Sequence, residues 1–196
     1  TSAAGDIHIL PKQKKNKKYP WVAILSNGKQ NKRIKVVKQY SFGEYISKHG
    51  CSIAAIVEAL EIYGINKNPY EINKYCRSHY KFNGSKVAIH GAYKTVKAIS
   101  KKKPVYHDVK QNNKTNIRKI IKESLKAGKK VVIEQKNPIH TYVALGFALN
   151  GKVVIATSGQ LKEVSLAWIM KTINTGDGSK ADYFKGSKAD AGIFII

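Results

Sequence analysis

The chain has 196 residues and a formal net charge of +24, because 36 Lys and Arg outnumber 12 Asp and Glu. This length suits one domain with a short tail, and the 42% hydrophobic content excludes a wholly disordered chain. No apolar run is long enough to form a membrane-spanning helix.

Residues 1–20 are predicted to be a basic, solvated and flexible tail, since lysines alternate there with Asn and Gln between two prolines. Residues 21–196 are predicted to form a single domain. The first residues contain neither an initiator Met nor the apolar core of a signal peptide. We therefore expect a processed or trimmed product whose export signal lies outside this chain.

The first half of the domain is predicted to be mainly helical. After two short strands at 21–25 and 34–37, a helix starts behind Gly50, and its apolar residues recur at helical spacing until Gly64. Most of its other positions are small or apolar, so this helix should be buried. Asn68 and Pro69 then predict the capped start of a second helix, and a third covers residues 91–100.

The second half is predicted to be rich in strands. A helix capped by Thr115 ends at Gly128, and another covers residues 166–173. Two strands are joined by a hairpin turn at Asn150-Gly151. A short duplication at 178–182 and 186–190 predicts a surface loop or hairpin. The expected strands lie at 104–106, 130–135, 141–149, 152–157 and 192–196. Because helices come first and antiparallel strands follow, the sequence predicts an α+β fold.

The charge suggests an anionic partner, but not sequence-specific nucleic acid. Nearly all the cations are Lys, and the few Arg are Arg33, Arg77 and Arg118, whereas base recognition favours the planar Arg side chain. A non-catalytic module that binds an anionic cell-surface polymer such as teichoic acid remains an alternative function. With two cysteines and none of the usual zinc-site spacings, the sequence predicts no disulfide scaffold, metal or cofactor.

Cys51 is the strongest candidate for chemistry. It stands immediately before or at the first turn of the buried helix, where backbone N–H groups and the helix dipole stabilise a thiolate. The best candidate for its base is His140, which opens an apolar strand and so stands at a sheet edge. His49 could line the cleft, whereas His79 continues the apolar face of its helix and is predicted to be a core residue.

These residues resemble papain-fold cysteine peptidases akin to the bacterial double-glycine leader (bacteriocin-processing) peptidases. Such proteins carry a Gln, then a Gly-Cys segment that opens a buried helix, then a His that enters a strand. Gln39, Gly50-Cys51 and His140 stand at these positions, over roughly residues 34 to 165. The Gly-Pro-Thr that typically follows the Cys is replaced here. The resemblance implies a papain-like fold with the Cys-bearing helix packed on a C-terminal antiparallel sheet.

The family's fourth element, an Asp or Asn on the next strand, is replaced by Thr157 or Ser158. A hydroxyl can orient the imidazole but supplies no compensating charge. Three alternatives follow: a weakened dyad works, another group substitutes, or the protein no longer cleaves. In an active protein, Gln39 would stabilise the oxyanion beside the Cys51 backbone N–H.

The sequence therefore predicts a cysteine peptidase or thiol amidohydrolase that acts on a peptide or protein substrate outside a bacterial cell, secreted or at its surface. A cell-wall peptidase of the NlpC type is the alternative within the same fold. The anionic-polymer module is the alternative from a different class, and a general nucleic-acid binder is the third.

Overall fold

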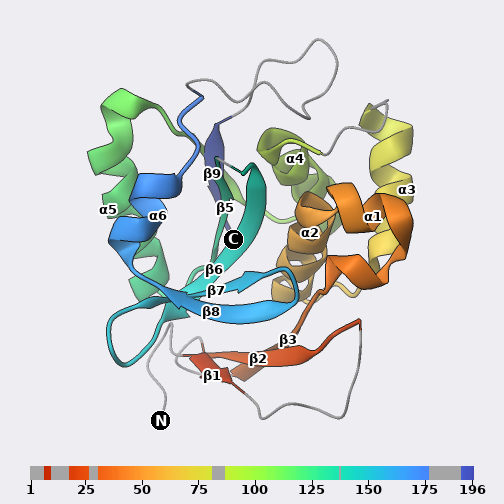
Figure 1. Cartoon of the computed structure of the whole chain (residues 1–196), viewed down its shortest axis with the longest axis horizontal. Helices are drawn as coiled ribbons and strands as arrows, with labels where there is room; N and C mark the ends of the chain where they lie inside the picture. The colour runs from red at the N-terminus through yellow and green to blue at the C-terminus, as the bar shows by residue number, and fades with distance from the viewer. Residues whose placement is uncertain (1–6, 10–17, 27–30, 81–86, 137, 177–190) are drawn as a thin grey trace.

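The computed structural model describes residues 7–9, 18–26, 31–80, 87–136, 138–176 and 191–196, and Figure 1 shows its fold. The duplication at 178–190 lies outside these residues. The helices are α1 (Gly43–His49), α2 (Cys51–Ile62), α3 (Pro69–Tyr80), α4 (Ile89–Ser100), α5 (Lys114–Lys126) and α6 (Leu166–Thr172), with 3-10 turns η1 (Gln39–Ser41) and η2 (Gln111–Asn113).

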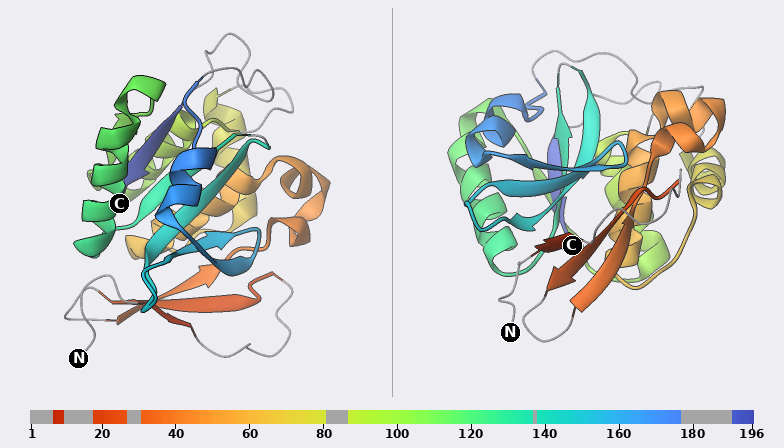
Figure 2. Two further views of the ribbon diagram at one scale, coloured as in Figure 1. Left: turned by 60° about the vertical axis from the view of Figure 1, so that its left-hand side comes forward. Right: turned by 60° about the horizontal axis from the view of Figure 1, so that its bottom comes forward.

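Two antiparallel sheets are formed. The larger has the strand order β4-β9-β5-β6-β7-β8, and the smaller has the order β1-β2-β3 and lies at one end of the molecule (Figure 2). The strands are β1 (Ile7–Ile9), β2 (Trp21–Ser26), β3 (Asn31–Val36), β4 (Val105–Asp108), β5 (Val131–Gln135), β6 (His140–Phe147), β7 (Val153–Thr157), β8 (Gln160–Val164) and β9 (Gly192–Ile195).

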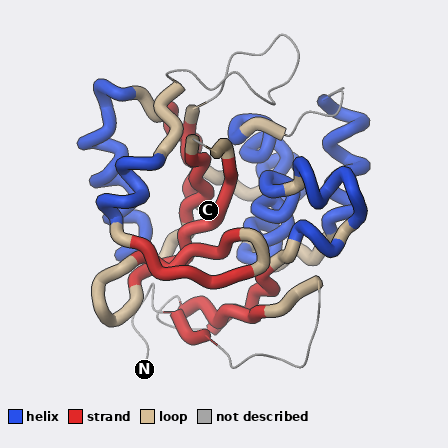
Figure 3. Tube along the Cα trace, viewed as in Figure 1, coloured by secondary structure: helices blue, strands red, loops and turns tan. Residues whose placement is uncertain are grey.

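Helices flank both faces of the larger sheet, with α1 to α4 on one side and α5 and α6 on the other (Figure 3). Alternate residues of the central strands face two hydrophobic cores. Val132 and Val143 face the core that contains α2 and α4, whereas Val131 and Ala144 face the core against α5 and α6. The α+β arrangement predicted from the order of elements is confirmed, including the packing of the Cys-bearing helix on the antiparallel sheet.

Most of the predicted elements are confirmed, and α2 is buried along its length from Cys51 to Leu60. The Asn68 carboxamide oxygen accepts a hydrogen bond from the Glu71 N–H at 2.9 Å, as a helix cap does. The predicted Thr115 cap was wrong, because the helix begins at Lys114 behind Asn113. Besides β1, the helix α1 and the strand β8 were not predicted, because α1 is too short and β8 too polar for a clear periodicity.

The smaller sheet changes the expected N-terminal boundary. β1 (Ile7–Ile9) lies within the predicted tail, yet it pairs antiparallel with β2, placing Ile7 opposite Leu25. The prediction of a flexible tail was therefore wrong for residues 7–9. The physical reason is that β3 pairs with only one edge of β2. Without β1, the backbone N–H and C=O groups along the other edge of β2 would have no strand to pair with. The rest of residues 1–17 lies outside the described part.

Glu58 of α2 is buried, and its carboxylate oxygen accepts a hydrogen bond from the Val37 N–H at 3.1 Å. Burial raises the pKa of this carboxyl well above its ordinary value of 4.5. Because its pKa is higher in the folded state than in the unfolded state, the protonated Glu58 carboxyl contributes to stability below pH 4.5. This contribution is lost as the pH rises toward the pKa of Glu58 in the folded state. The interaction nevertheless joins α2 to the segment that leads into Gln39.

Glu58→Gln is therefore expected to stabilise the protein at pH 7 and to have little effect at pH 4. The amide keeps an acceptor for Val37 but carries no charge to bury. The gain should grow above pH 4.5 by up to about 1.4 kcal/mol per pH unit until the folded-state pKa is reached. Urea unfolding of both proteins across this pH range measures it. Equal stability of the two at pH 7 would contradict the prediction.

Candidate active site

Cys51 is the first residue of α2 and is 6% exposed. Gly50 precedes Cys51 and connects α1 to α2, at a point where the backbone of α1 leaves no room for a side chain. A Cβ at position 50 would collide with the backbone oxygen and the side chain of Ile46. The same Ile46 oxygen accepts a hydrogen bond from the Gly50 N–H at 2.8 Å. The close approach of α1 to Gly50 thus fixes the start of α2 and the position of the thiol.

His140 is the first residue of β6 and is half-buried. It pairs with Gln135 at the end of β5, whose side-chain amide donates a hydrogen bond to the Pro138 carbonyl at 3.3 Å. This hydrogen bond joins the end of β5 to the residue two positions before His140. Nε2 of His140 lies 2.6 Å from Oγ1 of Thr157, within hydrogen-bond distance. The imidazole is thus oriented by a residue of β7.

Thr157 is the last residue of β7, and a two-residue turn follows it. Ser158 and Gly159 both have positive φ, 49° and 75°, and Thr157 pairs with Gln160 across the turn. This backbone is typical of a type I′ hairpin, which favours Gly at its second position. A Cβ at Gly159 would also lie 2.6 Å from the Cβ of Lys38. The β7–β8 turn is therefore seated against the residue that precedes Gln39.

Gln39 opens η1 and is 5% exposed. Its amide nitrogen donates a hydrogen bond to the backbone oxygen of Ser47 in α1 at 3.1 Å. That nitrogen carries a second hydrogen, and the carboxamide oxygen is buried without a partner in the described part of the chain. The side chain is thus held on one side by α1 and keeps hydrogen-bonding capacity for a ligand.

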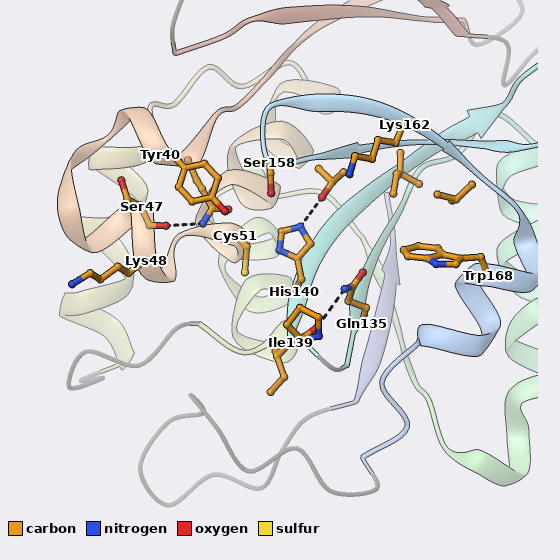
Figure 4. Close-up of a pocket in the computed structure, with 15 residues that line it drawn as sticks. Tyr40, Ser47, Lys48, Cys51, Gln135, Ile139, His140, Ser158, Lys162 and Trp168 are labelled. Carbon is orange, nitrogen blue, oxygen red and sulfur yellow. Dashed lines mark hydrogen bonds between the residues drawn. The ribbon is translucent and has the colours of Figure 1, made fainter.

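All five residues predicted for the site, Gln39, Cys51, His140, Thr157 and Ser158, line one pocket of about 850 Å³ (Figure 4). Of the two hydroxyls left open by the sequence, the Thr157 hydroxyl contacts His140. Ser158 makes no hydrogen bond with the residues that the structure describes. The pocket is also lined by Tyr40, Ser47, Lys48, Gln135, Pro138, Ile139, Ile155, Lys162, Val164 and Trp168.

A buried hydrogen bond that the sequence did not reveal joins the residue after Cys51 to the residue after His140. Oγ of Ser52, next to Cys51, lies 3.2 Å from Oγ1 of Thr141, next to His140. Ser52 also donates to the Val87 carbonyl at 2.6 Å. Ser52 is fully buried and Thr141 is 3% exposed. These contacts fasten the start of α2 to the start of β6. Two separate hydroxyl residues carry no sequence signal of such a pairing.

Ser52→Ala is expected to cost about 1–3 kcal/mol of stability, because it leaves the Val87 carbonyl and the Thr141 hydroxyl without this partner. It should also lower hydrolytic activity by loosening the start of α2 relative to β6. Thr141→Ser, which keeps a hydroxyl, serves as the matched control and should retain more activity than Thr141→Val. Urea unfolding and peptide hydrolysis measure the two effects. An unchanged stability of Ser52→Ala would refute the role of the buried bond.

The other sulfur and imidazole candidates do not join the site. Cys76 is fully buried, and burial raises the pKa of its thiol to about 11. The prediction of a core role for His79 was wrong, since its exposed ring stacks on Tyr75 at a centroid distance of 3.8 Å. This residue follows the apolar stripe of α3, but the helix end is solvated. The side chain of His49 lies outside the described part.

The sequence profile of the Peptidase_C39 like family matches residues 31–170, which is more than half of the chain. The chain belongs to the Peptidase_C39 like family. The matched range contains Gln39, Cys51, His140 and Thr157, and the predicted relationship to bacteriocin-processing peptidases and their papain-like fold is confirmed. No curated protein matches the chain.

Membership in the Peptidase_C39 like family indicates cysteine peptidase activity and a peptide substrate. Besides the residues after Cys51, this chain departs from the expected pattern at the residue that contacts the imidazole, which is Thr157 rather than Asp or Asn. Among the helices that the structure describes, none has the length and apolar character needed to cross a membrane.

Proposed function

We propose that the protein is a cysteine peptidase or thiol amidohydrolase in which Cys51 is the nucleophile and His140 the general base. The observation that supports this assignment is that Cys51, at the first turn of α2, and His140, bonded to Thr157, line the same pocket. A hydroxyl that accepts the Nε2 proton leaves Nδ1 as the ring nitrogen that exchanges a proton with the thiol.

Catalysis then proceeds by two acyl transfers. The Cys51 thiolate attacks the carbonyl carbon and forms a C–S bond, and the protonated His140 gives its proton to the departing amine as the C–N bond breaks. Water, deprotonated by His140, attacks the resulting thioester. The C–S bond breaks, the acid product leaves, and the thiolate is restored.

The oxyanion of each tetrahedral intermediate needs hydrogen-bond donors that are in place beforehand. The Cys51 backbone N–H, which lies in the first turn of α2, is one candidate donor. The second is the Gln39 amide nitrogen, of which one hydrogen serves Ser47 and the other remains for the oxygen. Removal of one such donor typically costs about 10²–10³ in kcat.

The Cys51–His140 pair is tested by alkylation, which requires no knowledge of the substrate. Wild-type Cys51 is expected to react with iodoacetamide at pH 6 faster than a free thiol such as glutathione, and His140→Ala is expected to lose this advantage. Mass spectrometry identifies the modified residue. Reaction at pH 6 no faster than that of the free thiol in both proteins would exclude an activated Cys51.

The cations suggest where such an enzyme acts. The exposed face of α5 carries Arg118, Lys119 and Lys126, and Lys129 follows the helix. A surface of this kind is attracted to anionic polymers of a bacterial cell wall, in agreement with a secreted or cell-surface protein. Retention on teichoic acid should then fall steeply between 50 mM and 200 mM salt, as for other polyelectrolyte contacts. Retention that does not depend on salt would exclude an anionic cell-wall polymer as the partner.

A further inference from the structure

The described charged residues that line the pocket are all positively charged. Among the described residues that line it, the charged ones are Lys48 and Lys162, and none is an Asp or Glu. Lys48 forms an ion pair with Glu44 at 3.0 Å on α1. Lys162 has neither an ion pair nor a hydrogen bond with any residue in the described part of the chain. The unbalanced cation of the pocket is therefore Lys162.

Lys162 lies on the same face of the sheet as the residue that orients His140. It pairs with Ile155 across the β7–β8 hairpin, and Thr157 pairs with Gln160 two positions along. Paired residues of neighbouring strands point to the same face, as do residues two apart on one strand. Figure 4 shows Lys162 and Trp168 on the side of His140 away from Tyr40 and Lys48.

Trp168 supplies an apolar surface in the same pocket as this cation. The side chain is 36% exposed, and its ring lies 6.2 Å from the ring of the buried Tyr142, centroid to centroid. The Ser165 hydroxyl accepts a hydrogen bond from the Trp168 N–H at 2.9 Å, which fixes the first turn of α6. The backbone of Trp168 is thus fixed at the start of α6, and its ring lies against Tyr142.

We propose that this half of the pocket selects a substrate with an acidic side chain beside the scissile bond, and that Lys162 binds its carboxylate. A charge-assisted contact of this kind is stronger than a neutral hydrogen bond. A basic side chain in the same place would face an uncompensated ammonium. This inference rests on the proposed function, because it assigns a substrate class to the same site.

The first experiment is a digest of a peptide library by wild-type protein and Lys162→Gln, analysed by mass spectrometry. The wild type should cleave peptides with Glu within two residues of the scissile bond about tenfold faster than their Gln counterparts, as expected for one charge-assisted contact. Lys162→Gln should lose this preference and still cleave neutral peptides. Lys171→Gln, which removes an exposed lysine of α6 outside the pocket, is the matched control.

A second measurement tests the cation without peptide cleavage. The rates at which Cys51 reacts with anionic iodoacetate and with neutral iodoacetamide are compared in each protein at 0.15 M salt. Lys162→Gln should lower the ratio of the rate with iodoacetate to the rate with iodoacetamide, because it removes the charge that attracts the carboxylate of iodoacetate into the pocket. Lys171→Gln should leave the ratio unchanged.

The two experiments separate the inference from the proposed function. Cleavage of neutral peptides with no preference for Glu, together with an unchanged reagent ratio in Lys162→Gln, would overturn the role of Lys162 and leave the peptidase assignment standing. Failure to cleave any peptide would count against the peptidase assignment. In that case a lowered reagent ratio in Lys162→Gln, and not in Lys171→Gln, would still support a carboxylate-binding cation in the pocket that contains Cys51.

Discussion

Cys51→Ala is expected to reduce peptide hydrolysis by several orders of magnitude. The substitution removes the only side chain in the proposed mechanism that forms a bond to the substrate carbon, and loss of a covalent nucleophile is among the costliest single changes in such a site. The assay is the hydrolysis of a fluorogenic peptide, or of the library peptides, by purified protein at equal concentration.

The fold of this variant should survive, because Cys51 keeps 6% of its surface exposed and stands at the end of a helix rather than within one of the two hydrophobic cores. Cys76→Ala is the matched control. It removes the other buried thiol, beside Thr95, and should cost about 1 kcal/mol or more of stability while activity is retained. Hydrolysis that persists in Cys51→Ala would rule out Cys51 as the nucleophile.

Thr157 is the second position at which a large effect is expected. Thr157→Val keeps the shape of the side chain but removes the oxygen that lies 2.6 Å from His140 Nε2. The imidazole then loses its orienting partner and its preferred tautomer, and kcat should fall about tenfold or more. Thr157→Ser, which keeps the hydroxyl, is the conservative control and should retain most of the activity.

Thr157→Asp and Thr157→Asn are expected to raise kcat above that of the wild type. An amide restores the group that the family pattern leads us to expect, and a carboxylate also stabilises the charged imidazole. Lys162, on the same face of the neighbouring strand, would help to keep an introduced carboxylate ionised. Measurement of kcat against pH for Thr157→Asp and Thr157→Asn separates two effects: both variants orient the imidazole of His140, and only the carboxylate stabilises its charged form. Equal kcat values in all five proteins would show that this position does not act on His140.

Several features of the fold could be predicted because their signals are local. The apolar spacing from Ile53 to Leu60, the Asn68 cap and the Asn150-Gly151 turn each depend on neighbouring residues. Elements with weak local signals were missed. β8 is a polar edge strand that is stabilised by pairing with β7, and β1 exists because β2 offers it an edge.

The sequence by itself determined the type of chemistry. A Cys after Gly50, at the start of a buried helix, and a His that opens a strand are properties of short segments, and they sufficed to indicate a thiol–imidazole pair and the papain-like family. The net charge of +24, which suggests an anionic partner, did not contribute to that conclusion.

Only the tertiary structure decided how these segments meet. It selected Thr157 over Ser158 as the partner of His140, because the β7–β8 turn reverses the chain after Thr157 and seats Gly159 against Lys38. It also brought Ser52 to Thr141 and placed Lys162 beside Trp168 in one pocket. Such contacts join residues distant in the chain, and they depend on strand register and helix packing, which no short segment specifies.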